Sequence, residues 1–177
     1  MYYGEIKYHD IANGLGIRVT LFVSGCTHHC KGCFNSETWD FCYGKKFTQQ
    51  VEDDIIKACG RPFIKGLTIL GGEPFEKANQ ESVCHLLKRF KDAFPEKDVW
   101  CYSGYTYDTD MLEGGKIFTP FTNDILSCID YLVDGEFKEE LKNLMLKFRG
   151  SSNQRIIDVK KSLKENKTIC IEDEALE

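Results

Sequence analysis

The stretch IRVTLFV, residues 17–23, decides how the rest of the chain is interpreted. It is an almost continuous run of β-branched and apolar residues, and a run of this length is typical of a strand buried on both faces. The sequence SGCTHHCKGCFN, residues 24–35, follows the strand at once and contains three cysteines. Because parallel α/β sheets build their sites where strands end, we expect a functional site at this end of the strand.

Strands and helices are predicted to alternate along the rest of the chain. Apolar runs predict strands at 66–70, 99–102 and 130–134 and a short one at 156–159, and helical spacing predicts helices within 51–59, 83–90, 125–129 and 141–148. Parallel strands need crossover connections, so this alternation indicates an α/β fold with a parallel sheet. The sequences GGEP, SGYTYD and DGEF each follow a predicted strand and would lie at the same edge of the sheet as the cysteines.

The length of 177 residues suits one domain, which we expect to span 1–177, with a core at about 3–159 and an extension at 160–177. A closed eight-stranded barrel usually needs about 250 residues, so the chain is long enough for only part of one. The acidic end IEDEALE, residues 171–177, is interpreted as a solvated tail.

Composition and charge favour a cytoplasmic protein that binds neither nucleic acid nor a membrane. The N-terminus MYYGEIKYHD resembles no signal peptide, and no apolar run is long enough to cross a bilayer. The net charge of -5 and the scattered basic residues lack the footprint of a nucleic-acid binder. Nine cysteines in such a chain indicate reduced thiols, metal ligation or catalysis rather than disulfides.

Cys26, Cys30 and Cys33 form a CxxxCxxC pattern, which lets three thiolates converge from one loop. A zinc site would need a fourth ligand, for which His28 or His29 is available, although both lie in a cramped position between the first two cysteines. A [4Fe-4S] cluster would be held through three irons, leaving one iron open to a ligand. The spacing leaves both interpretations open. The other six cysteines show no second metal-like spacing and are expected to be core or idle surface thiols.

Three further features have an ordinary and a functional interpretation. GGEP, residues 71–74, is either a turn or a place where backbone groups and Glu73 meet the amino group of a ligand. Arg18 is expected either to form a surface salt bridge or to orient a carboxylate or a partner peptide. RGSSNQR, residues 149–155, is either a solvated loop or a surface that recognises an extended peptide.

Together, CxxxCxxC after the first main strand and GGEP after the next resemble the radical S-adenosylmethionine superfamily. Within it, residues 13–35 and 131–159 resemble the activating proteins of anaerobic ribonucleoside-triphosphate reductase, and RGSSNQRIID, residues 149–158, is the most specific part of the match. The resemblance covers about residues 3–159 and implies an incomplete parallel β/α barrel of the radical S-adenosylmethionine type.

The resemblance also implies the roles of individual residues. Cys26, Cys30 and Cys33 would ligate the [4Fe-4S] cluster, whose open iron binds the methionine part of S-adenosylmethionine. The backbone around Gly32, Cys33 and Phe34 would lie against the nucleoside, and Gly72 and Glu73 would meet the methionine amino group. Ser103 and Gly104 would contact the methionine or the ribose, although a turn of small residues is often only a turn.

The implied reaction is radical chemistry carried by the cofactors. The reduced cluster would cleave S-adenosylmethionine to methionine and a 5′-deoxyadenosyl radical, which would remove hydrogen from a glycine of the large reductase subunit. A one-electron donor such as flavodoxin or ferredoxin would supply the electron, and no acid/base residue is expected at the centre. Two alternatives are the activase of another glycyl-radical enzyme, such as pyruvate formate-lyase, and a noncatalytic zinc-binding adaptor.

Overall fold

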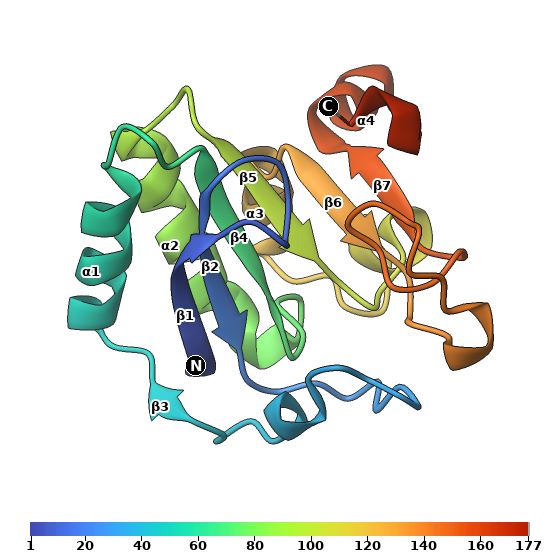
Figure 1. Ribbon diagram of the computed structural model, residues 1–177, viewed down its shortest axis with the longest axis horizontal. Coiled ribbons are helices and arrows are strands. Elements are labelled where there is room, and N and C mark those ends of the chain that lie inside the picture. The colour runs from blue at the N-terminus through green and yellow to red at the C-terminus, as the bar shows by residue number, and fades with distance from the viewer. Residues whose placement is uncertain (177) are drawn as a thin grey trace.

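The computed structural model describes residues 1–176, in which seven strands form one open sheet (Figure 1). The order of strands across the sheet is β3-β1-β2-β4-β5-β6-β7. The strands are β1 (Tyr2–Asp10), β2 (Arg18–Val23), β3 (Lys45–Lys46), β4 (Gly66–Gly71), β5 (Asp98–Tyr102), β6 (Tyr131–Asp134) and β7 (Arg155–Asp158). The α-helices are α1 (Gln49–Cys59), α2 (Lys77–Ala93), α3 (Thr122–Cys128) and α4 (Val159–Glu165).

The four central strands, β2, β4, β5 and β6, are parallel, as the sequence predicts. The outer strands β1, β3 and β7 pair antiparallel with their neighbours, so the prediction of a wholly parallel sheet is wrong at both sides. The sheet ends at β3 on one side and at β7 on the other and does not close. The α/β class is therefore confirmed in the form of a mixed, open sheet.

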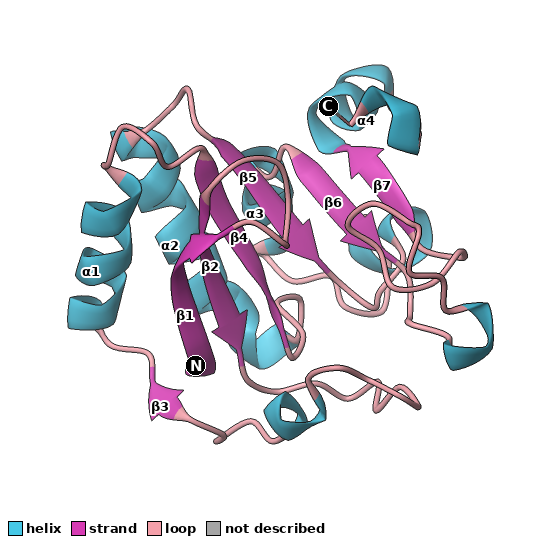
Figure 2. Cartoon of the chain, viewed as in Figure 1, coloured by secondary structure: helices cyan, strands magenta, loops and turns pink. Residues whose placement is uncertain are grey.

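Helices α1, α2 and α3 pack on one face of the sheet, where the main hydrophobic core lies (Figure 2). β2 contributes Val19, Leu21 and Val23 to this core, because alternate residues of a strand point to the same face. Thr48 caps α1 by accepting a hydrogen bond from the backbone N–H of Val51, as predicted. None of the helices in residues 1–176 combines the length and the hydropathy needed to span a membrane.

The opposite face of the sheet carries a smaller apolar cluster that includes the end of the chain. Leu176 is only 3% exposed and packs in this cluster with Trp100, Val133 and Ile156. Asp173 forms an ion pair with Arg149, and the Lys147 side chain donates a hydrogen bond to the Leu176 carbonyl. The described part of the predicted solvated tail is thus anchored to the sheet through Leu176, although Glu172, Glu174 and Ala175 are exposed, and α4 precedes it where no helix is predicted.

The helix predicted at 141–148 is absent from the structure. A short 3-10 turn, Glu139–Leu141, ends at the first residue of this segment, and irregular backbone follows. Leu144 and Met145 are 84% and 88% exposed, so no apolar surface receives the face that the periodicity would form. Phe148 has a φ of 54°, which a right-handed helix excludes.

Candidate functional site

The loops that follow the four parallel strands lie at one end of the sheet, where the arrowheads of β2 and β5 point in Figure 1. The cysteine loop follows β2, and SGY follows β5. GGEP begins at the last residue of β4, and DGEF begins at the last residue of β6. The predicted site residues therefore share one edge, because the C-terminal ends of parallel strands coincide.

Backbone hydrogen bonds hold GGEP against the beginning of the cysteine loop. Glu73 N donates to the carbonyl of Gly25 at 2.8 Å, and Gly72 N donates to the carbonyl of Val23 at 2.7 Å. A Cβ on Gly72 would lie 2.6 Å from the Gly25 carbonyl oxygen, which explains the glycine at this position. Gly25 itself has a φ of 99°, which only glycine adopts readily. The contact between the two motifs is thus built into the backbone.

The side chain of Glu73 links the ends of β4 and β5. Its Oε1 accepts hydrogen bonds from the Ser103 hydroxyl and from Phe75 N, both at 2.9 Å. Its Oε2 accepts a 2.7 Å hydrogen bond from Gly104 N, and the residue is only 1% exposed. The structure therefore brings together Glu73, Ser103 and Gly104, three of the residues predicted to contact S-adenosylmethionine.

Cys26 is buried, Cys30 and Cys33 are half-buried, and all three are free thiols. Burial raises the pKa of Cys26 to about 12 and that of Cys30 to about 11, and the neighbouring carboxylates of Glu73 and Glu136 add to these shifts. These two thiols are therefore neutral at pH 7 unless a cation displaces their protons. Soft sulfur ligands of this kind suit iron–sulfur clusters and zinc.

The cysteine loop offers three thiols and two histidines as possible metal ligands. Within residues 1–176, no three His, Cys, Asp or Glu side chains lie close enough to hold one metal ion. A [4Fe-4S] cluster does not require this, since each thiolate binds a different iron. The two histidines have other contacts: His28 packs on Tyr105 with ring centres 4.3 Å apart, and His29 stacks on Trp39 at 4.7 Å.

His28 faces Glu73 at the centre of the edge. Its Nε2 lies 3.4 Å from Glu73 Oε2, is buried, and forms no hydrogen bond within the described chain. Burial lowers the pKa of His28, but the nearby carboxylates, Glu73 foremost and then Glu136 and Glu76, together raise it overall. A buried polar atom whose nearby partner, Glu73, lies at 3.4 Å without forming a hydrogen bond fits a site that receives a polar ligand.

Gly32 and Phe34 lie on the outer side of the cysteine loop, where the segment after β6 reaches them. Gly32 has a φ of 73°, and Phe34 is 65% exposed with its ring centre 5.5 Å from that of Phe137. Lys31 pairs with Glu139 at 3.1 Å. The sequence analysis predicts DGEF at this edge. The sequence carries no local signal, however, that Phe137 and Glu139 contact the cysteine loop.

Two further residues of this edge were missed at the sequence level. Glu76 Oε1 accepts hydrogen bonds from Thr27 N at 2.8 Å and from the Thr27 hydroxyl at 2.6 Å. The Asn79 amide donates to the carbonyls of Ser24 and Glu73, both at 3.0 Å. Both follow GGEP closely in sequence, and polar residues at a predicted strand-to-helix connection are the signal that could have found them.

Arg18 and the segment 149–155 differ from their ordinary interpretations. Arg18 is fully buried and pairs with Asp98 at 2.6 Å at the beginning of β2, so its interpretation as a surface salt bridge is wrong. Gln154 Oε1 accepts hydrogen bonds from Gly150 N and Ser151 N, and Ser151 is fully buried. The segment is therefore held by its own side chains rather than being a solvated loop.

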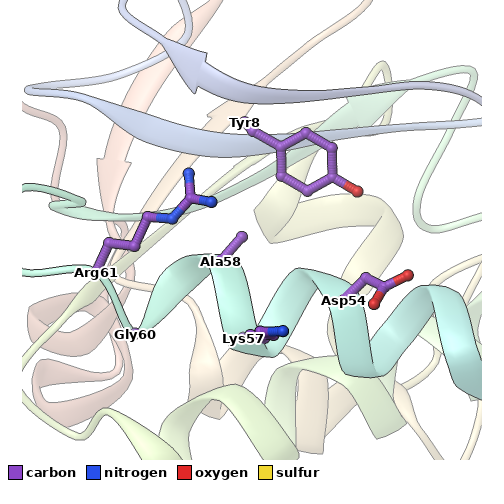
Figure 3. Close-up of a pocket in the computed structure, with 6 residues that line it drawn as sticks. All are labelled: Tyr8, Asp54, Lys57, Ala58, Gly60 and Arg61. Atoms are coloured by element: carbon purple, nitrogen blue, oxygen red, sulfur yellow. The ribbon is translucent and has the colours of Figure 1, made fainter.

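A cavity of about 550 Å³ lies between β1 and α1 (Figure 3). It is lined by Tyr8, Asp54, Lys57, Ala58, Gly60 and Arg61. None of the predicted site residues lines it, and the register of β1 on β2 places Tyr8 near the beginning of β2, away from the cysteine loop.

The six cysteines outside the loop follow the prediction, since Cys42 and Cys170 are exposed and the others are buried.

Comparison with known proteins agrees with the geometry of the site. The family model described as a 4Fe-4S single cluster domain matches residues 12–157. The anaerobic ribonucleoside-triphosphate reductase-activating protein of Vibrio cholerae is 41% identical over 158 residues, which cover 85% of this chain and 97% of that protein. Proteins of the same name from phage T4 and Escherichia coli K12 are 37% and 39% identical, covering 88% and 84% of this chain and 93% and 96% of theirs.

The chain belongs to the family of anaerobic ribonucleoside-triphosphate reductase-activating proteins. Membership confirms the resemblance drawn from the motifs. The 4Fe-4S domain match supports the iron–sulfur interpretation of the CxxxCxxC loop over the zinc adaptor. The matched region ends before α4, so the packed C-terminal extension lies outside it.

Proposed function

We propose that this chain installs a glycyl radical on the anaerobic ribonucleoside-triphosphate reductase, using a [4Fe-4S] cluster and S-adenosylmethionine. One observation supports this most directly: Glu73 N bonds to the Gly25 carbonyl, so GGEP lies directly against the CxxxCxxC loop. The names of the relatives supply the target protein. The electron would come from a one-electron donor of the flavodoxin or ferredoxin type.

The chain would hold the cluster through Cys26, Cys30 and Cys33 and leave the fourth iron open to the cofactor. When bound, a reduced cluster with S-adenosylmethionine supplies a 5′-deoxyadenosyl radical that can remove hydrogen from a glycine Cα. The protein would bind and orient the cluster and S-adenosylmethionine, and it would exclude water from them. Phe34, exposed at the outer side of the loop, would cover the nucleoside together with the backbone of Gly32 and Cys33.

Glu73 would meet the positively charged amino group of the methionine part. Its buried carboxylate already holds the Gly104 N–H and the Ser103 hydroxyl, so the two strand ends are fixed before the ligand arrives. A pre-formed acceptor of this kind costs little rearrangement on binding. Gly72 lets the backbone carbonyls of Gly25 and Thr38 approach closely, since a Cβ here would lie 2.6 Å and 2.8 Å from them.

The open sheet would serve as the incomplete barrel of the radical S-adenosylmethionine fold. A sheet that does not close leaves a side through which a protein loop can approach the cofactor, whereas a closed barrel would exclude so bulky a substrate. Nine cysteines, all free thiols, also fit a reducing cytoplasmic setting.

Anaerobic electron paramagnetic resonance tests the proposal. The reconstituted, reduced protein is mixed with S-adenosylmethionine and the anaerobic reductase, and a glycyl radical signal is expected. Cys30→Ala should abolish the signal, whereas Cys42→Ala, which removes an exposed thiol outside the CxxxCxxC pattern, should preserve it. Cleavage of the cofactor without a glycyl signal would contradict the assigned target and direct the search to other glycyl-radical enzymes.

A further inference from the structure

A cavity of about 310 Å³ opens beside the cysteine loop, on the face of the sheet that α1, α2 and α3 leave uncovered. Phe22 points to this face because its neighbours Leu21 and Val23 lie in the helix-covered core. Glu5 is the partner of Phe22 in the pairing of β1 with β2, so both side chains are on the same face. The other wall is the segment 34–38 with Tyr43, and it begins one residue after Cys33.

The lining combines aromatic rings with carboxylates. Phe22, Phe34 and Tyr43 contribute rings, and Glu5 and Glu37 contribute negative charge. Glu5 has a weak partner, Lys7, at 4.0 Å, and both side chains are about half exposed. Glu37 accepts a 2.8 Å hydrogen bond from the Tyr43 hydroxyl, which leaves its charge unneutralised. Ring faces and carboxylates together attract a cation.

Two lysines of the chain already use these rings in the way that an incoming cation would. Lys7 Nζ lies 5.0 Å from the centre of the Phe22 ring, and Lys142 Nζ lies 4.8 Å from the centre of the Phe34 ring. Among residues 1–176, the Lys7 ammonium has a long contact with Glu5 and a contact with this ring, so an incoming group can displace it at little cost.

We propose that this cavity binds a basic side chain, arginine or lysine, from the protein segment that carries the target glycine. The inference rests on the proposed function, which requires such a segment to approach the cluster loop. The cavity adjoins Cys33 through Phe34 and lies near the edge of the sheet, where β3 pairs with only two residues of β1. A basic residue bound here would hold the neighbouring backbone beside the cluster loop and set the register of the glycine. Arginine is the better fit, because its planar guanidinium stacks on rings and pairs with carboxylates at once.

Peptide titration of the cluster-free protein tests the cavity without any radical chemistry. The probes are acetyl-Gly-Arg-Gly-amide and its neutral analogue acetyl-Gly-norleucine-Gly-amide, followed by ¹H–¹⁵N nuclear magnetic resonance. The arginine peptide is expected to shift the amides of residues 4, 5 and 34–38, and the norleucine peptide is not. In the double variant Glu5→Gln/Glu37→Gln the affinity should fall about 5-fold or more, since the two charges supply much of the attraction.

The matched control is Glu96→Gln/Glu113→Gln, which removes the same charge from exposed sites elsewhere. It should bind the arginine peptide as the wild type does. Equal shifts with both peptides, or equal affinities of the two double variants, would overturn the proposal.

The same variants are then assayed with the reductase. The reductase concentration that gives half-maximal glycyl radical should rise about 5- to 10-fold in Glu5→Gln/Glu37→Gln and stay unchanged in the control. Cofactor cleavage without reductase reports separately whether the cluster site is intact. If the wild type forms no glycyl radical, the proposed function fails, while the peptide titration still decides whether the cavity binds a basic side chain.

Discussion

The carboxylate of Glu73 accepts a 2.7 Å hydrogen bond from the backbone N–H of Gly104. The two residues follow β4 and β5, neighbouring parallel strands, so one buried charge ties together two of the loops that form the candidate site. The same carboxylate accepts the Ser103 hydroxyl. The geometry of this edge therefore depends on an acceptor of full negative charge at Glu73.

Replacing that charge should destabilise the edge. In Glu73→Gln, one carboxylate oxygen becomes an NH₂ group that cannot accept, so at least one of the three donors that now bond to Glu73 loses its acceptor. We expect a loss of about 1–3 kcal/mol in the free energy of unfolding, measured by urea denaturation of the cluster-free protein. Glu81→Gln, on the exposed side of α2, should change it by less than about 0.5 kcal/mol. Similar losses in both variants would contradict the role assigned to Glu73.

Arg155 stabilises a buried carboxylate at the end of β6. Its guanidinium pairs with Asp134, which is 1% exposed, at 2.5 Å and with the more exposed Asp108 at 3.0 Å. Arg155→Met would leave Asp134 with the N–H of Tyr107 as its remaining donor. We expect unfolding free energy to fall by about 3 kcal/mol, against less than about 1 kcal/mol for Asp108→Asn. Equal losses of unfolding free energy in Arg155→Met and Asp108→Asn would contradict the stabilising role of the buried Asp134 pair.

The same network predicts how acid affects stability. Hydrogen bonds from Arg155 lower the pKa of Asp108 below its ordinary value of 3.8, and partial burial only partly opposes this. A carboxyl group with a lowered folded-state pKa contributes stability above its unfolded pKa and loses it as pH falls through the folded value. Asp108→Asn should therefore show a shallower loss of stability below about pH 4 than the wild type does, as measured by urea denaturation at several pH values. Asp92→Asn, at an exposed position of α2, serves as the control and should follow the wild type.

The sequence predicted correctly those elements of the fold that depend on composition and on residues close in the chain. The strand at 17–23 and the cap at Thr48 depend on composition and on neighbouring residues, and both are found. β1 was missed because most of its residues are partly or fully exposed, and its place depends on antiparallel pairing with β2. The helix at 141–148 failed for the opposite reason: its periodicity is local, but no apolar surface is available to bury Leu144 and Met145.

The candidate site also has parts that the sequence predicts and parts that depend on contacts between distant segments. The cysteine loop and GGEP could be placed at one edge because parallel strands end together. The contacts of Glu73 with Ser103 and Gly104 follow from that placement. The contact of Phe137 with Phe34 joins the loops after β6 and β2, which are not neighbours in the sheet, so no local pattern in the sequence predicts it.

Gly72 is predicted to be irreplaceable where GGEP meets the cysteine loop. A Cβ there would lie 2.6 Å from the Gly25 carbonyl and 2.8 Å from that of Thr38, both backbone atoms that cannot turn away. Gly72→Ala should lower the unfolding free energy by about 1–3 kcal/mol and reduce the iron retained after anaerobic reconstitution. Gly60→Ala is the control, since Gly60 has a φ of -69° and its nearest neighbours would be 3.4 Å away. Retention of full iron in Gly72→Ala would count against the backbone contact as a determinant of the site.

The packing of Leu176 makes the C-terminal extension part of the folded core. Leu176 is 3% exposed among Trp100, Val133 and Ile156, whereas Leu163 on α4 is 39% exposed. Leu176→Ala should reduce the unfolding free energy by about 2–3 kcal/mol, and Leu163→Ala by much less, because only the first leaves a buried cavity. Both are measured by thermal and urea unfolding. If the tail were solvated, as its acidic composition suggests, the two variants would unfold alike; a clear difference requires that the extension contributes a side chain to the core.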